Sequence, residues 1–308
     1  MRWSTLPVGL VLVYHLLDDH TGDPESDLVA PHATALFEEH LALLKRHYRC
    51  VTASEFAGAV QARRRGQRPP IAITFDDDSL SHTRRALPAL ASAGVRASFF
   101  LTGASLGGPS SYWWGDLETL WRRDGPSAGP ALSERLGLGS SDVHPPSLKS
   151  LAGAIERLPP EGRSAAAGEL RRAVAQPSSP VLSPMEIRGL VEAGHEVGFH
   201  TRRHHRLTGL DRPELQWAMV EGRDELAAAA GAPVRTIAYP HGRTNATVAA
   251  EAGAQGFEAG FSTVARRHLA DDDPFGIGRY WPSYGTPALF ALDVGQLLAG
   301  RWGPERQE

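Results

Sequence analysis

The sequence predicts an α/β fold: a distorted (β/α) barrel of about seven parallel strands with a helical insertion. Two observations support this prediction. Short apolar runs alternate with helical patterns along most of the 308 residues, which is the order of elements in a parallel α/β fold. The alternation lapses at residues 103–180, where Gly, Pro and Ser are dense, and it resumes directly afterwards. We therefore predict one barrel domain over residues 1–308, with the segment 103–180 inserted in it.

Each predicted strand is a short run of apolar and β-branched residues, with turn-forming residues on both sides of it. The run from Pro70 to Phe75 is typical, because Pro precedes the apolar residues and three Asp residues follow them. The predicted strands cover residues 8–14, 70–76, 95–101, 195–199, 234–238 and 258–262, and a further short segment is expected around residues 276–280.

The predicted helices lie between these strands, and two of them begin at clear capping signals. Thr52 with Glu55 and Ser183 with Glu186 have the spacing of a capping box, and Pro184 suits a first helical position. In the barrel we expect helices over residues 33–47, 52–65, 81–93, 183–194, 212–230, 246–253 and 287–298. In the insertion we expect helical segments near residues 113–123, 148–158 and 165–175.

Composition and charge narrow the function classes. The formal net charge of -3 argues against a basic surface for nucleic acid, so we expect no nucleic-acid partner. Cys50 is the only cysteine and cannot form an internal disulfide. The apolar run 6–17 is too short for a transmembrane segment. Since Arg2 is the only charge before this run and no small-residue cleavage site follows it, we expect a cytoplasmic protein.

Polar clusters follow directly after four of the predicted strands. They are His15, Asp76 with Asp77, His200 with His204, and the turn Tyr239, Pro240, His241 and Gly242. By itself the acidic run 76–78 would equally suit a helix N-cap. In a parallel barrel, however, the carboxyl ends of all strands meet on the face that carries the active site. Two imidazoles and one carboxylate suit a borderline divalent cation with an open position, and a further carboxylate can act as a base in metal-assisted hydrolysis.

These motifs resemble the signature motifs of the polysaccharide deacetylase family, the NodB-homology group of carbohydrate esterases. The resemblance is carried by Thr74-Phe75-Asp76-Asp77, by His200-Thr201-Arg202-Arg203-His204 and by the turn Tyr239-Pro240-His241-Gly242. The opening Leu12-Val13-Tyr14-His15 resembles the circularly permuted branch, which includes poly-N-acetylglucosamine deacetylases. The resemblance covers most of the chain outside the insertion.

The resemblance implies a role for each matching residue. Asp77, His200 and His204 match the metal ligands, for which Zn2+ is the usual occupant. Asp76 matches the catalytic base, and His15 matches the general acid that protonates the leaving amine. Backbone N–H groups of residues 239–242 match an oxyanion stabiliser, which binds charge that develops only in the transition state.

The chain departs from the family pattern at three places. The family usually has Gly at the position of Asp78 and Pro-Pro-Tyr in place of Tyr239-Pro240-His241. It also has an Arg, which orients the catalytic base, at the position of Ala238. Arg235 and Arg279 are candidates to replace this Arg.

Three further residues are candidates for substrate contacts. Trp113 and Trp114 follow Tyr112 in the insertion and could form a stacking platform for a sugar ring; the alternative is that they anchor the insertion to the barrel. Arg279, in the short segment around residues 276–280, is the third candidate.

We therefore expect a metal-dependent hydrolase that removes an N-acetyl group from an amino-sugar-containing substrate and releases acetate. The substrate would be a glycan, a glycoconjugate or a sugar-bearing metabolite. Two alternatives stay open. One is hydrolysis of another C–N bond, in a cyclic imide, a ureide or a formamide. The other is a non-catalytic saccharide-binding protein on the same fold.

Overall fold

A computed structural model describes residues 6–107, 112–139, 147–174 and 181–301 of the chain. The chain divides into two compact units. The first contains the chain up to residue 20, residues 32–106 and the chain from residue 182 onward, and the second contains residues 21–31 and 107–181. The second unit therefore contains most of the predicted insertion 103–180, parts of which lie outside the described residues. It also contains residues 21–31, which we assigned to the barrel.

The first unit is built on a mostly parallel sheet whose longest strands, β1 (Val8–Tyr14) and β5 (Pro70–Asp76), lie side by side. The strand order is β10-β1-β5-β6-β7-β8-β9. The further strands on this path are β6 (Ser98–Leu101), β7 (Glu196–Phe199), β8 (Thr236–Ala238), β9 (Ala259–Phe261) and β10 (His268–Leu269). Two more strands pair with it in parallel: β4 (Arg49–Val51) with β5, and β11 (Arg279–Tyr280) with β1.

The segment around β11 joins the two ends of the curled sheet. Ile277 forms a parallel bridge with Phe261 of β9, and two residues later β11 pairs with β1. The backbone N–H of Ile277 donates to Gly260 O at 3.0 Å, and the N–H of Ser262 donates to Ile277 O at 2.8 Å. Strands β1, β5, β6, β7, β8, β9 and β11 thus run parallel around a distorted barrel, which confirms the predicted fold class.

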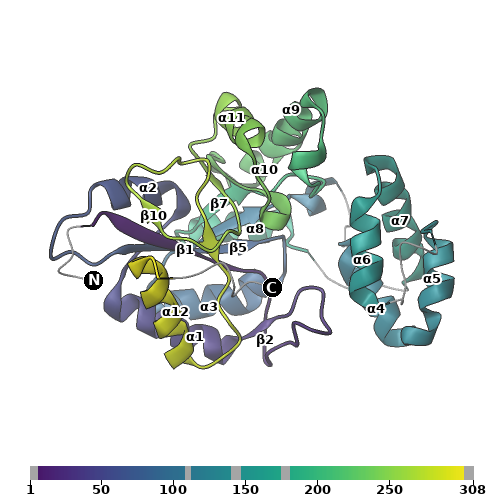
Figure 1. Ribbon diagram of the computed structural model, residues 1–308, viewed down its shortest axis with the longest axis horizontal. Helices are drawn as coiled ribbons and strands as arrows, with labels where there is room; N and C mark the ends of the chain where they lie inside the picture. Colours follow the sequence, from purple (N-terminus) through teal and green to yellow (C-terminus); the bar gives the residue numbers. More distant parts are fainter. Residues whose placement is uncertain (1–5, 108–111, 140–146, 175–180, 302–308) are drawn as a thin grey trace. The chain divides into compact units, whose positions relative to one another are not determined.

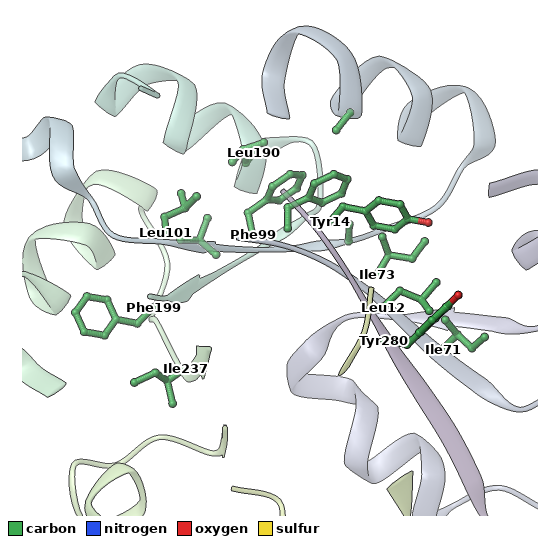
Figure 2. Packing of buried hydrophobic residues seen from close by; sticks show 14 of the residues in the cluster. Leu12, Tyr14, Ile71, Ile73, Phe99, Leu101, Leu190, Phe199, Ile237 and Tyr280 are labelled. Carbon is green, nitrogen blue, oxygen red and sulfur yellow. The ribbon is translucent and has the colours of Figure 1, made fainter. Parts of the chain in front are cut away.

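Apolar residues fill both faces of these strands. Along β1, Leu10, Leu12 and Tyr14 belong to a large buried cluster between the sheet and its helices, whereas Val11 belongs to a smaller cluster with Phe100. This alternation follows from the two-residue period of a strand. Figure 2 shows side chains of the large cluster, from Leu12 and Ile73 to Phe199 and Ile237. Because both faces are covered, every residue of β1 and β5 is buried.

Most helices of the first unit cover the outer face of the sheet, whereas Phe56 and Val60, in α2, pack in the smaller cluster with Val11. In Figure 1, α1, α3 and α12 lie together, and α9, α10 and α11 form another group. The helices are α1 (Thr34–His47), α2 (Ala53–Gln61), a π-helical turn (His82–Ala86) that continues into α3 (Leu87–Ala93), α8 (Pro184–Glu192), α9 (Arg212–Val220), α10 (Arg223–Ala230), α11 (Ala246–Ala254) and α12 (Pro287–Ala299). Short 3-10 helices lie at Ala104–Gly107, Pro126–Ala128, Leu207–Gly209 and Pro240–Gly242.

The predicted capping boxes at Thr52 and Ser183 are both confirmed. The single helix predicted over 212–230 is wrong, because the chain breaks between α9 and α10 at Gly222. Gly222 has φ 78°, a left-handed backbone that interrupts the helix and that glycine adopts most readily. The sequence prediction also missed β4, β10 and the two-stranded pair β2 (Leu17–Asp18) with β3 (His32–Ala33).

The second unit is helical and has its own apolar core. Its helices are α4 (Trp113–Asp124), α5 (Gly129–Arg135), α6 (Leu148–Arg157) and α7 (Pro160–Ala173), of which α5 was not predicted. Leu117, Leu151, Ile155 and Leu170 lie at the centre of a cluster separate from those of the first unit. Among the helices that the structure describes, none is both long and apolar enough to cross a membrane.

Candidate active site

The predicted site residues of the first unit lie at the carboxyl ends of neighbouring parallel strands. His15 follows β1, Asp76 ends β5, His200 follows β7, and Tyr239 follows β8. The strands pair in register, for example Tyr14 with Phe75, so their ends meet at one edge of the sheet. The structure therefore brings together groups as far apart in the chain as His15 and Tyr239.

Asp77, His200 and His204 form a cluster that could hold a metal ion. Asp77 Oδ1 lies 3.9 Å from His200 Nε2 and 3.8 Å from His204 Nε2, and the three ligand atoms lie within 4.8 Å of one another. His200 Nδ1 donates to the carbonyl of Ala238 at 2.8 Å, which directs Nε2 toward the cluster. Asp77 Oδ1 is buried without a hydrogen-bond partner, a costly state for a carboxylate oxygen.

These three residues fit a divalent cation. Ligand atoms at tetrahedral positions around Zn2+ lie about 3.4 Å apart, given Zn–N and Zn–O distances near 2.1 Å. The observed 3.8 Å and 3.9 Å separations reach that value with small side-chain movements. A cation would also satisfy the buried oxygen of Asp77. Burial, followed by the charges of Asp76 and Asp78, raises the pKa of Asp77, so ionised Asp77 requires a compensating positive charge.

Backbone strain in the described part of the chain is concentrated at this site. Among the described residues, the non-glycine residues with left-handed φ are Asp77 (69), Thr201 (56), His204 (49) and His241 (57). Each such conformation costs free energy for a residue with a Cβ, most of all for β-branched Thr. The strain sets the directions in which Asp77 and His204 point, two of the three candidate ligands.

Arg279 fixes the orientation of Asp76. Its Nη1 donates to Asp76 Oδ1 at 2.6 Å and its Nη2 donates to Oδ2 at 2.7 Å. The guanidinium is itself held by Ser262 O and Thr74 Oγ1 at 3.1 and 3.3 Å. The Arg279 side chain is 0% exposed, so Arg279 can affect a bound substrate only through Asp76. Arg279 and Arg235 are the two candidates to replace the Arg that the family has at the position of Ala238. Arg279 contacts Asp76, whereas Arg235 pairs with Glu258 at the surface.

The same arginine keeps Asp76 ionised. Burial by itself raises the pKa of this carboxyl, but the charge of Arg279, that of His200 and the hydrogen bonds from Arg279 together hold it well below its ordinary value. Asp76 Oδ2 lies 3.9 Å from both His15 Nε2 and His200 Nε2. Asp76 is thus a fixed carboxylate between the candidate metal ligands and His15.

His15 is packed between an aromatic ring and Asp76. Its imidazole stacks on Trp281 with centroids 4.2 Å apart and an interplanar angle of 14°. His82 Nε2 donates to the His15 carbonyl at 2.9 Å and fixes the backbone. Burial lowers the pKa of His15 to about 3, although the negative charge of Asp76 opposes this shift. The sequence analysis did not single out Trp281; its position directly after the strand that carries Arg279 was the available signal.

Two of the backbone N–H groups in the turn after β8 form hydrogen bonds within the fold. The N–H of Tyr239 donates to Phe261 O at 2.9 Å, the N–H of Gly242 donates to Tyr239 O at 2.8 Å, and Pro240 has no N–H. The N–H groups of Tyr239 and Gly242 are therefore used within the fold, and the oxyanion role of this turn stays a prediction; the His241 ring lies 4.7 Å from that of His204. Gly242 has φ 64, and a Cβ there would lie 1.8 Å from Thr263 Oγ1.

Asp78 has a structural position. Its carboxylate accepts hydrogen bonds from the N–H groups of Thr102 at 2.8 Å and Ala104 at 2.9 Å and from the hydroxyl of Thr102. The left-handed backbone that the family's usual Gly suggested for this position is found one residue earlier, at Asp77. Asp78 therefore organises the loop after β6.

The two tryptophans predicted to contact substrate lie in the second unit, at the start of α4. Tyr112 stacks on Trp114 with ring centroids 4.2 Å apart, and Trp113 meets Trp114 edge to face at 5.6 Å. Trp113 also packs against the apolar core of that unit. Substrate contact by Trp113 and Trp114 stays a prediction.

Comparisons with solved structures agree with this fold. The chain is similar to the Streptococcus pyogenes deacetylase PplD in complex with acetate, with 16% identity and a TM-score of 0.63 over 96% of this chain and 99% of that chain. It is similar to IcaB from Ammonifex degensii, with 18% identity and a TM-score of 0.56 over 96% and 98%. It is also similar to a de-N-acetylase from Aggregatibacter actinomycetemcomitans, with 15% identity and a TM-score of 0.60 over 93% and 99%. At these identities the likeness shows the shared fold.

The sequence itself identifies the family. No curated protein matches the chain. Residues 63–260, more than half of the 308 residues, match the family model for polysaccharide deacetylase. The matched range contains Asp76, Asp77, His200, His204 and the turn at 239–242, whereas His15, Arg279 and Trp281 lie outside it. The chain therefore belongs to the polysaccharide deacetylase family of carbohydrate-modifying enzymes.

Proposed function

We propose that this enzyme is a metal-dependent N-deacetylase, which hydrolyses the acetamide of an amino sugar in a saccharide and releases acetate. The observation that carries the proposal is the position of Asp76. Two hydrogen bonds from Arg279 fix it directly beside the Asp77, His200 and His204 cluster and 3.9 Å from His15. A base, a cation site and an acid thus share one edge of the sheet.

Asp77, His200 and His204 would hold the cation, for which Zn2+ suits the mixed nitrogen and oxygen ligands. When bound, a divalent cation polarises the amide carbonyl and makes a water molecule more acidic. The left-handed backbone at Asp77 and His204 and the hydrogen bond from His200 to Ala238 hold the ligand atoms in place before binding.

Asp76 would act as the general base. Its carboxylate is ionised and oriented by Arg279, and it lies next to the ligand Asp77 in the chain. It can therefore accept a proton from the water that attacks the acetamide carbon. Because Arg279 already uses both carboxylate oxygens, the proton is bound only weakly and is readily passed on.

His15 would deliver the proton to the leaving amine. Its Nε2 lies 3.9 Å from Asp76 Oδ2, so a proton taken up by the carboxylate has a short path to the imidazole. The low pKa of His15 makes its protonated form a strong acid, which favours transfer to the more basic amine nitrogen. A backbone N–H of the turn at residues 239–242, beside His204, would donate to the oxyanion.

A substrate panel tests this proposal. Acetate release would be measured with N-acetylglucosamine oligomers, and turnover with a formamide, a ureide and a cyclic imide, for the wild type, Asp76→Asn and the control Asp19→Asn. Asp19 is an exposed carboxylate paired with Arg85. We expect acetate release by the wild type and the control, and a loss of about 10²- to 10⁴-fold in Asp76→Asn.

Two other outcomes would contradict the N-deacetylase proposal. Turnover restricted to the formamide, ureide or imide would indicate a different C–N substrate. Saccharide binding without turnover, unchanged in Asp76→Asn, would indicate a binding protein on this fold.

A further inference from the structure

An exposed tryptophan lies beside the loop that carries the candidate metal ligands. Trp217, on α9, is 45% exposed, and Val220, one turn further along, is also 45% exposed. The opposite face of α9 buries Leu215, Ala218 and Met219 in the core. The helix is therefore anchored without Trp217. Single exposed apolar side chains are common on protein surfaces, so the contacts that Trp217 makes with its polar neighbours decide its role.

The indole of Trp217 is held by an ion pair. The guanidinium of Arg203 lies over the ring, with Cζ 4.2 Å from the centroid. Glu221 fixes the same guanidinium through hydrogen bonds of 3.0 Å to Nε and 3.1 Å to Nη2. Arg203 lies against the face of the indole, and Trp217 remains 45% exposed with this contact in place. Such a ring is ordered before any ligand arrives, which lowers the entropic cost of binding.

This aromatic group is directly connected to the candidate active site. Arg203 lies between His200 and His204 in the chain, and the left-handed residues Thr201 and His204 restrict the conformation of that loop. Arg203, which stacks on Trp217, directly precedes the candidate metal ligand His204 in the chain. Figure 1 shows α9 grouped with α10 and α11, the helices that flank β8, from which the His241 turn follows.

We propose that Trp217, with Arg203 and Glu221, forms a saccharide-binding subsite that holds a sugar unit of an extended substrate outside the catalytic centre. The inference rests on the proposed function. The apolar C–H face of a pyranose packs on an indole, while the arginine donates to ring hydroxyls and the carboxylate accepts from them. One apolar surface with a few fixed polar groups is the usual composition of a small-molecule site.

The size of the patch favours a saccharide over a second protein copy. Trp217 and Val220, each 45% exposed, present on the order of 150 Å² between them, since a whole aromatic side chain offers about 150–250 Å². A specific protein interface needs roughly 800 Å² from each partner. The patch is therefore far too small for a stable dimer and matches the area of one or two sugar rings.

Equilibrium binding tests the subsite. Isothermal titration calorimetry would compare N-acetylglucosamine with its tetramer, in the Asp76→Asn background so that no substrate is consumed. Trp217→Ala would be compared with Leu292→Ala, which removes an equally exposed side chain from α12, a helix that packs on α1 and β1. We expect Trp217→Ala to weaken tetramer binding about tenfold and monosaccharide binding not at all. Trp217→Phe should retain most of the affinity, and Leu292→Ala all of it.

The results separate the subsite from the catalytic proposal. Equal affinity of Trp217→Ala and Leu292→Ala for the tetramer would overturn the subsite. So would a loss of affinity in Trp217→Ala that is the same for tetramer and monosaccharide. A parent protein that binds the tetramer no more tightly than the monosaccharide would overturn it as well. Trp217-dependent tetramer binding by a wild-type enzyme that releases no acetate would support the subsite and contradict the proposed reaction.

Discussion

Arg279 holds both oxygens of Asp76, at 2.6 and 2.7 Å, across 203 positions of the chain. The pair is buried: Asp76 is the last residue of β5, and Arg279 is the first residue of β11, in register with Val11 of β1. A bidentate pair of this kind fixes the direction of a carboxylate as well as its charge. This contact would position Asp76 for the base role proposed above.

Replacing Arg279 with Lys should impair catalysis without removing the cation site. Lysine keeps the charge but loses the two-pronged contact, so Asp76 becomes free to rotate. We expect kcat to fall about 100-fold, within the range that a general base contributes, with metal stoichiometry unchanged. The control Arg235→Lys, at the exposed pair with Glu258, should retain full activity. Wild-type kcat in Arg279→Lys would show that the bidentate contact is not needed.

Trp281 should act as a positioning residue for His15. The stacked rings, 4.2 Å apart, limit the rotation of the imidazole, so removing the ring should lower kcat more than it raises KM. We expect Trp281→Leu to lose about tenfold in kcat, since small displacements of catalytic groups have effects of this size or larger, whereas Trp281→Phe keeps a stacking partner and most of the activity. Steady-state kinetics of both variants provide the measurement. Equal kcat in Leu and Phe variants would rule out a role for ring stacking.

Histidines buried away from the site should make the fold sensitive to mild acid. His40 is fully buried, its Nδ1 lies 3.0 Å from Tyr14 Oη, and its ring stacks on Phe290. Burial lowers the pKa of His40 to about 3, from an ordinary value near 6.5. The neutral form is therefore favoured by folding; its contribution is complete above pH 6.5 and is lost progressively as the pH falls toward 3.

Between pH 7 and pH 5, protonation of His40 in the unfolded chain alone should lower the free energy of unfolding by about 2 kcal/mol. Urea unfolding at the two pH values, for the wild type and His40→Gln, measures this effect. The variant should lose less stability on acidification, by the equivalent of one titrating proton. An identical pH dependence in both proteins would show that His40 does not titrate as expected.

The sequence was sufficient to predict the barrel and the central constellation because both depend on local patterns. Apolar runs mark the strands, and polar residues at their ends must converge once the strands are parallel. The strand pattern predicts that four residues lie together at one edge of the sheet, and the structure brings them together there: Asp76, Asp77, His200 and His204.

Features that depend on long-range contacts were not predictable in this way. Whether Arg235 or Arg279 replaces the missing arginine depends on how residues 277–280 join β9 to β1, and a two-residue strand carries almost no pattern. The stack of Trp281 on His15 links residues 266 positions apart, and no spacing indicates it. The break between α9 and α10 lies at the left-handed backbone of Gly222, which helical periodicity does not reveal.

The central claim is that Asp77, His200 and His204 bind the cation on which deacetylation depends, and one paired measurement tests it most directly. Metal content and acetate release from an N-acetylglucosamine oligomer would be determined on the same preparations of the wild type and Asp77→Asn, before and after chelation and Zn2+ addition. We predict about one metal ion per wild-type chain, acetate release that disappears on chelation and returns with Zn2+, and neither property in Asp77→Asn. Acetate release that persists without metal, or full metal content and activity in Asp77→Asn, would contradict the account.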